Sequence, residues 1–97
     1  FSDNIYTASY YGKEHHGKKT ASGQKFNMYD MTAAHKSLPF GTKVKVTNIK
    51  NGKSVIVRIN DRGPFSKSRE LDLSYSAFQQ ISSISSGLVK ITYEVVE

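Results

Sequence analysis

The sequence predicts a mainly β domain whose strands close, or nearly close, into a barrel. Five or six short segments alternate apolar with polar residues, as strands with one buried face do. The dipeptide Asn51-Gly52 separates two of these segments and is typical of a tight hairpin turn. The one or two short helical segments do not alternate regularly with the strands, which argues against a parallel α/β sheet. A barrel is therefore expected, and its closure also leaves no strand edge unpaired.

The N-terminal part of the chain supplies a first strand, a loop and a second strand. Residues 5–11 alternate, with Ala8 and Tyr10 on one face. Residues 12–27 are polar and contain glycines, so we expect a long ordered loop there, and long loops in small domains are often functional. Residues 31–35 are apolar enough for a short second strand.

A β-hairpin is the clearest local feature of the sequence. Val44 and Val46 alternate with polar residues in its first strand, and residues 55–59 return as its second strand. Asn51-Gly52 supplies the positive backbone angles of the turn between them.

The C-terminal part of the chain predicts a strand, a helix and a final strand. Residues 71–73 form the short strand, and Ser74 is a residue type that caps helices. We expect the helix at residues 75–81. Residues 89–95 alternate again, which predicts a terminal strand with one buried face.

Composition limits the classes of function. The 97 residues are 37% hydrophobic, which suits one compact domain spanning residues 1–97. The chain has no cysteine, and the adjacent His15 and His16 lack the neighbouring ligands of a metal site, so we assign no metal and no cofactor. No segment approaches the roughly twenty apolar residues of a membrane helix.

The net charge points to a polyanionic partner. The chain carries 14 Lys and Arg against 8 Asp and Glu, a balance of +6, which favours polyanionic partners such as nucleic acid, anionic lipid or acidic cell-wall glycans without choosing among them. The basic residues are scattered and form no concentrated stripe on a helix, which argues against nucleic acid. We expect a monomer.

A carboxylate and a guanidinium lie where the second hairpin strand ends, in the segment Asn60-Asp61-Arg62-Gly63-Pro64-Phe65. Gly63-Pro64 prevents the strand from continuing. Because a strand end is a rigid support, Asp61 is expected to be held by the sheet and open to a ligand. The alternative is an aspartate that hydrogen-bonds the backbone of its own turn.

A series of short motifs resembles the rare lipoprotein A family. The motifs cover nearly the whole chain: Ala8-Ser9-Tyr10-Tyr11-Gly12, Thr20-Ala21-Ser22-Gly23, Thr32-Ala33-Ala34-His35, Leu38-Pro39-Phe40-Gly41-Thr42, Val46-Thr47-Asn48, Asn60 to Phe65, and Arg69 followed by Leu71-Asp72-Leu73-Ser74. Each motif is short, but their joint order and spacing make the resemblance specific.

The resemblance implies a six-stranded double-psi β-barrel, a fold also found in expansins and family-45 endoglucanases. It implies a lytic transglycosylase of the bacterial cell envelope that cleaves peptidoglycan glycan strands poor in stem peptides and leaves 1,6-anhydro ends. Family members are lipoproteins, here expected at the periplasmic face of the outer membrane. The lipidated cysteine and the frequent peptidoglycan-binding repeat domain are missing from this chain, which resembles the barrel excised from a longer exported lipoprotein. The alternative is a non-catalytic, expansin-like module that binds peptidoglycan, because the fold alone does not decide function.

The expected reaction needs one carboxyl group that both gives and takes a proton. The glycosidic oxygen between N-acetylmuramic acid and N-acetylglucosamine must be protonated, and the muramyl 6-hydroxyl must later lose its proton as it attacks the anomeric carbon. Ordinary glycosidases need a second carboxylate for water or for a covalent intermediate. The resemblance places the acid at Asp61 and a second catalytic group at His35. Without the resemblance, His35 would be interpreted as a hydrogen-bonded, partly buried histidine.

Position 24 departs from the family pattern. The family commonly carries glutamate where this chain has Gln24. An amide can hydrogen-bond a sugar or hold a neighbouring carboxyl group, but it cannot exchange a proton at useful pH. If the family glutamate only orients the substrate, Gln24 can replace it; if the glutamate donates the proton, this chain should be slow or inert.

Five more residues are candidates for substrate binding. Arg62 can stabilise developing negative charge or bind the lactyl carboxylate, or it can pair with Asp72 or Glu70. The motif around Asp72 resembles the acidic position of expansins and family-45 endoglucanases, which makes Asp72 a second candidate acid. It should point away from its leucine neighbours, or it caps the turn before the helix. Tyr10, Tyr11 and Phe65 can stack on sugar faces, or they can fill a core.

Overall fold

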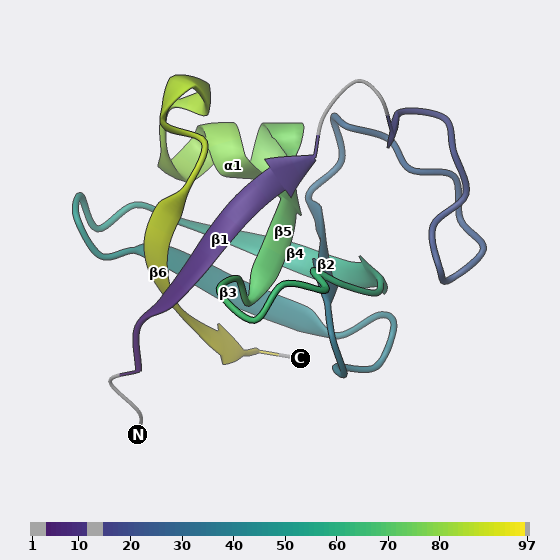
Figure 1. Ribbon diagram of the computed structural model, residues 1–97, viewed down its shortest axis with the longest axis horizontal. Coiled ribbons are helices and arrows are strands. Elements are labelled where there is room, and N and C mark those ends of the chain that lie inside the picture. The colour runs from purple at the N-terminus through teal and green to yellow at the C-terminus, as the bar shows by residue number, and fades with distance from the viewer. Residues whose placement is uncertain (1–3, 12–14, 97) are drawn as a thin grey trace.

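The computed structural model describes residues 4–11 and 15–96, which form a closed six-stranded barrel (Figure 1). The strands are β1 (Tyr6–Tyr11), β2 (Thr32–His35), β3 (Lys43–Asn48), β4 (Ser54–Asp61), β5 (Leu71–Ser74) and β6 (Val89–Val95). Their order around the barrel is β1-β5-β2-β4-β3-β6. Between β5 and β6 lie the helix α1 (Tyr75–Ile81) and the short 3-10 helix η2 (Ile84–Ser86). The predicted six-stranded, mainly β barrel with one or two short helices is confirmed.

The individual elements lie at, or within a residue or two of, their predicted positions. β3 and β4 form the antiparallel hairpin, with Val44 opposite Val57. The Ser74 side chain accepts a hydrogen bond of 3.2 Å from the N–H of Ala77 and so caps α1 as predicted. Within the described residues, no helix has the length and apolar character to cross a membrane.

A long irregular loop connects β1 to β2 and lies beside the barrel (Figure 1). The first residues of the expected loop, 12–14, lie outside the described residues. From residue 15 onward the loop contains no strand or α-helix before β2, and a bridge joins Lys19 to Lys25. The predicted long ordered loop is therefore confirmed for residues 15–27.

Aliphatic side chains fill the barrel, and α1 adds Phe78 and Ile81 to the same core. This core also buries Val44, Val46, Val57, Ile59, Leu71, Leu73 and Ile91. A second, smaller cluster joins the long loop to the barrel and consists of Tyr11, Phe26, Met28 and Ala34. The loop is thus held to the outside of β1 and β2 by apolar contacts.

The register of the strands aligns four residues in one row across β1, β5, β2 and β4. Ser9 lies opposite Asp72, Asp72 opposite Ala34, and Ala34 opposite Asp61. Residues opposite one another on paired strands present their side chains on the same face of the sheet. The barrel therefore places Asp61 and Asp72 on one face, with the small Ala34 between them.

Candidate active site

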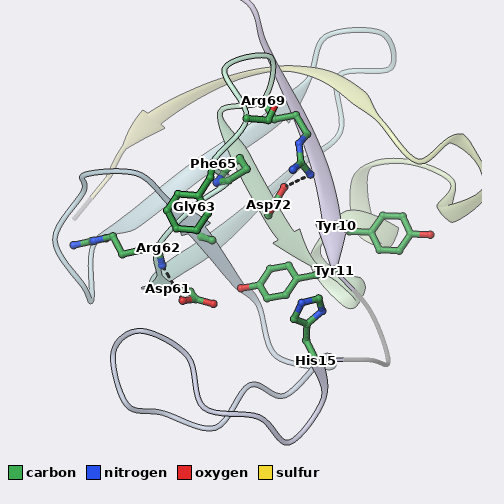
Figure 2. Close-up of a pocket in the computed structure, with 12 residues that line it drawn as sticks. Tyr10, Tyr11, His15, Asp61, Arg62, Gly63, Phe65, Arg69 and Asp72 are labelled. Atoms are coloured by element: carbon green, nitrogen blue, oxygen red, sulfur yellow. Dashed lines mark hydrogen bonds and ion pairs between the residues drawn. The ribbon is translucent and has the colours of Figure 1, made fainter.

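An open cavity of about 450 Å³ lies over this row of residues (Figure 2). Its lining comes from β1, β2, β5, the end of β4 and the adjoining loops. The lining residues are Tyr10, Tyr11, His15, Ala34, Asp61, Arg62, Gly63, Pro64, Phe65, Ser66, Arg69 and Asp72. A volume of this size is ordinary for a small-molecule site. The cavity brings together six of the eight residues expected from the sequence, leaving His35 and Gln24 outside its lining.

A β-bulge turns the Asp61 side chain towards the cavity. Ile59 points into the barrel core, so simple alternation along β4 would direct residue 61 inward as well. Ala33 pairs with Ile59, but the next residue of β2, Ala34, pairs with Asp61, so Asn60 is an extra residue in β4. A shift of one residue exchanges the faces of a strand. Asp61 is consequently only partly buried and lines the cavity beside Ala34.

Two backbone N–H groups hold one oxygen of the Asp61 carboxylate. Asp61 Oδ1 accepts hydrogen bonds of 2.8 Å from the N–H of Ala21 and from the N–H of Arg62. Asp61 thus bonds its own turn and also lines the cavity, so the two interpretations of this residue hold together. Among the described residues, Asp61 forms no ion pair and its Oδ2 accepts no hydrogen bond. Oδ2 is the oxygen left for a ligand.

Asp72, by contrast, is held by a cation. Asp72 Oδ1 lies 3.0 Å from Arg69 Nη1 and also accepts a hydrogen bond from the Ser9 hydroxyl. Arg69 Nη1 donates to the same Ser9 hydroxyl at 2.6 Å. Asp72 faces the cavity, as expected from its place between Leu71 and Leu73.

The Arg62 guanidinium is directed away from the cavity (Figure 2). Its Nη1 donates to the carbonyl oxygen of Leu38 at 2.8 Å and to that of His35 at 3.3 Å. Its charged carbon lies 4.1 Å from the centre of the Phe40 ring, a cation–π contact. The pairing with an acidic residue considered from the sequence is wrong, because Arg62 has no carboxylate partner among the described residues.

His35 is buried, with 5% of its surface exposed, and lies outside the cavity lining. Its Nδ1 accepts hydrogen bonds of 3.1 Å from the N–H groups of Ser37 and Leu38, so the proton of the neutral ring lies on Nε2. Nε2 is 3.1 Å from both Glu70 Oε2 and the Tyr93 hydroxyl. Burial raises the pKa of Tyr93, and the hydrogen bond and charge of Glu70 raise it further. The two expected catalytic side chains are therefore not brought together.

Gln24 contacts Arg58 and Asn60 of β4 and does not line the cavity of Asp61. Its Oε1 accepts hydrogen bonds of 3.3 Å from Arg58 and 3.4 Å from Asn60, and it lines a separate cavity of about 60 Å³. The same loop that supplies an N–H to Asp61 thus holds Gln24 against β4. Gln24 and the Ala21 N–H that binds Asp61 belong to the same loop, but Gln24 and Asp61 line different cavities.

Tyr10 and Phe65 line the cavity in opposite environments. The Tyr10 ring packs on Phe78 with ring centroids 4.9 Å apart, and its hydroxyl donates to the carbonyl oxygen of Ile84 at 3.3 Å. Phe65 is 90% exposed and presents its ring at the edge of the cavity. Of Tyr10 and Phe65, Phe65 is the one whose ring face is free to stack on a sugar.

Tyr11 lines the cavity, as expected for a residue that can stack on a sugar, and it is joined there by His15, which was not expected from the sequence. The Tyr11 ring stacks on Phe26 with centroids 4.5 Å apart, and the His15 ring meets Tyr11 edge-on at 5.1 Å. Tyr11 is two residues from Ser9 in β1 and therefore shares its outer face. His15 is brought in by the long loop, which has no regular period. In the described part of the chain, no group of three His, Cys, Asp or Glu residues could hold a metal ion.

A family model described as "Lytic transglycolase" matches residues 4–93. The chain belongs to this family. The resemblance to the rare lipoprotein A family is also confirmed. The chain is 53% identical over 90 residues to the probable endolytic peptidoglycan transglycosylase RlpA of Synechocystis sp., covering 93% of this chain and 28% of that protein. It is 52% identical over 89 residues to the endolytic peptidoglycan transglycosylase RlpA of Vibrio cholerae, covering 92% and 34%. The chain thus spans about a third of the length of these two relatives.

This lytic transglycolase family barrel also resembles solved structures of low sequence identity. A papain inhibitor from Streptomyces matches with a TM-score of 0.77 and 22% identity, covering 98% of this chain and 96% of that one. An expansin of Clavibacter michiganensis, solved in complex with cellohexaose, matches with a TM-score of 0.76 and 22% identity, covering 96% and 50%. These likenesses concern the fold, and with the family match they confirm the expected double-psi β-barrel.

Proposed function

We propose that this barrel is the catalytic part of a lytic transglycosylase that cleaves peptidoglycan glycan strands in the bacterial cell envelope. The observation that carries the proposal is the Asp61 carboxylate at the cavity, with Oδ1 fixed by two backbone N–H groups and Oδ2 open to a ligand. The two relatives named as endolytic peptidoglycan transglycosylases, at 52% and 53% identity, support the class of reaction.

Asp61 acts in this mechanism first as an acid and then as a base. Its carboxyl group gives a proton to the glycosidic oxygen, the bond from that oxygen to the muramyl C1 breaks, and N-acetylglucosamine leaves with a free 4-hydroxyl. The muramyl 6-hydroxyl then bonds to C1 and passes its proton to the Asp61 carboxylate. The product is a 1,6-anhydro end, and the carboxyl group is restored without water or a covalent enzyme intermediate.

The neighbouring residues have supporting roles. Phe65 offers a ring face for a sugar at the edge of the cavity, and the Arg69–Asp72 pair offers polar contacts across from Asp61. His35 and Gln24 act through the structure: His35 holds the segment after β2, and Gln24 holds the loop against β4. The proton steps require neither side chain.

The family resemblance also implies a substrate, an oligomeric state and a location, which we propose for this protein. The substrate is peptide-poor glycan, and the enzyme acts as a monomer at the periplasmic face of the outer membrane. Attachment to that membrane is through a lipid anchor rather than through the barrel. A net charge of +6 is consistent with glycan strands that carry free lactyl carboxylates.

The test is to incubate the protein with peptide-free glycan strands and to identify the soluble products by mass spectrometry. Asp61→Asn keeps an oxygen that can accept the two backbone hydrogen bonds but cannot supply the proton. We expect anhydro products from the wild type and a loss of about a hundredfold to ten-thousandfold in rate for the variant. The matched control is Asp30→Asn, an exposed aspartate outside the cavity lining. Wild-type rates in Asp61→Asn would refute the role of Asp61.

The alternative function, a non-catalytic glycan-binding module, has a distinct result. It is favoured by the glutamine at position 24 and by the fold shared with an expansin. In that case the wild type yields no anhydro products but sediments with peptidoglycan sacculi.

A further inference from the structure

The Tyr11 hydroxyl is an unsatisfied polar group at the cavity. Tyr11 is 9% exposed, and its Oη has no hydrogen-bond partner within the described residues. The two other buried polar atoms of this kind, on Thr32 and Asn60, belong to residues that do not line the cavity. Buried hydroxyl groups in proteins almost always have a partner, so an exception beside a cavity calls for one supplied by a ligand.

The ring of Tyr11 holds this hydroxyl in a fixed position. Phe26 stacks on the ring at 4.5 Å with an angle of 18° between the planes, and His15 contacts it edge-on at 5.1 Å. Figure 2 shows the hydroxyl end of Tyr11 directed towards Asp61. Because the ring is packed against Phe26 and His15, it cannot move to expose the hydroxyl to solvent.

The surroundings keep the hydroxyl protonated. Burial raises the pKa of Tyr11, and Asp61 and then Asp72, when ionised, raise it further. At neutral pH the group is therefore a hydrogen-bond donor. Tyr11 lines the same cavity as Asp61 and Asp72.

We propose that Tyr11 donates a hydrogen bond to an oxygen of the bound glycan, a sugar hydroxyl or an acetamido carbonyl, next to the glycosidic oxygen that Asp61 protonates. The contact fixes the sugar against Asp61 Oδ2. The inference rests on the proposed function for the identity of the cleaved bond, but the hydrogen bond itself requires only that a glycan enters the cavity.

The experiment uses Tyr11→Phe, which removes the oxygen and keeps the ring. The matched control is Tyr6→Phe, at the other end of β1, whose hydroxyl accepts a hydrogen bond of 3.3 Å from Asn4 and does not line the cavity. Each variant is measured for its melting temperature, for its affinity for short peptide-free glycan fragments by calorimetry, and for its rate of anhydro product formation.

For Tyr11→Phe we expect affinity or turnover to fall by about twofold to tenfold, the range for the net loss of one hydrogen bond. Its melting temperature should stay the same or rise, because a buried group without a partner has been removed. Tyr6→Phe should bind and cleave as the wild type does. A clear fall in the melting temperature of Tyr11→Phe would overturn the inference, because the hydroxyl would then have a partner inside the protein.

The remaining outcomes separate this inference from the proposed function. A wild type that cleaves, with Tyr11→Phe unchanged in affinity and rate, overturns the inference and leaves the function standing. A wild type that binds glycan without cleaving it overturns the function, and weaker binding by Tyr11→Phe then still supports the inference, whereas equal binding overturns it. A wild type that does not bind glycan overturns both.

Discussion

Asp61 and Asp72 stand in the same row of the barrel, separated by one strand whose residue in that row is Ala34. Neighbouring strands lie about 4.8 Å apart, so the two acids are two strand spacings from each other and the methyl group of Ala34 lies between them. Their partners differ: Asp72 is paired with Arg69, whereas Asp61 accepts only backbone N–H groups among the described residues. The site therefore contains one acid bound to a cation and one open to a ligand.

The Arg69–Asp72 ion pair is expected to contribute about 1 kcal/mol to the free energy of unfolding, since both side chains are partly exposed, at 32% and 19%. The measurement is a double-mutant cycle with Arg69→Met, Asp72→Asn and the combined variant in urea unfolding. The loss of stability in the double variant should be smaller than the sum of the losses in the two single variants. Strictly additive losses would show that the pair is not coupled.

Substitution of His35 is expected to act mainly through stability. His35→Ala removes the acceptor for two backbone N–H groups and the partner of Glu70 and Tyr93, so the free energy of unfolding should fall by about 2–3 kcal/mol. The control is His16→Ala, because His16 is exposed and accepts one backbone hydrogen bond, from the N–H of Met28, so the loss there should be about 1 kcal/mol or less. If His35→Ala unfolded like the wild type but made no anhydro product, a direct chemical role would replace the structural one.

Gln24→Glu is expected to change the cleavage rate by no more than about threefold, a small effect beside that of losing a positioned general acid. Gln24 lines a different cavity from Asp61, and a glutamate there would pair with Arg58. Gln80→Glu, on the exposed face of α1, adds the same charge elsewhere and serves as the control. An increase of tenfold or more, specific to position 24, would identify a proton donor that the present chain lacks.

Phe65→Ala is expected to weaken glycan binding by about threefold to tenfold, as the loss of an aromatic contact does. Because 90% of Phe65 is exposed, the free energy of unfolding should change by no more than about 0.5 kcal/mol. Phe65→Trp keeps a ring at this position and should retain binding. Equal affinities of Phe65→Ala and the wild type in calorimetry would remove Phe65 from the binding site.

The fold could be predicted from the sequence because its signals are local. The alternation of residues 44–47 and 55–59 around Asn51-Gly52 defines the hairpin, and Ser74 marks the start of α1. The strand pattern predicted a closed or nearly closed barrel, and the resemblance to a known family supplied the number of strands, six. The order of the strands, which pairs β1 with β5 and β2 with β4, depends on contacts distant in the sequence and had no local signal.

The site could be predicted only in part. Asp61 was expected at a ligand site because a strand ends there, and Phe65 because its ring can stack on a sugar. The structure puts both residues on the cavity. His35 lies in a motif of the family, but its side chain alternates away from Ala34 and is buried on the other face of β2. His15 depends on how the long loop packs on β1, which a period in the sequence does not reveal.

The extra residue in β4 decides whether Asp61 faces the cavity or the core. A chain lacking Asn60 would keep the hairpin and the core, but its aspartate would rotate into the barrel, where a charge is costly to bury. The number of residues between Ile59 and the aspartate therefore sets the environment of the carboxylate, while the shape of the barrel stays the same.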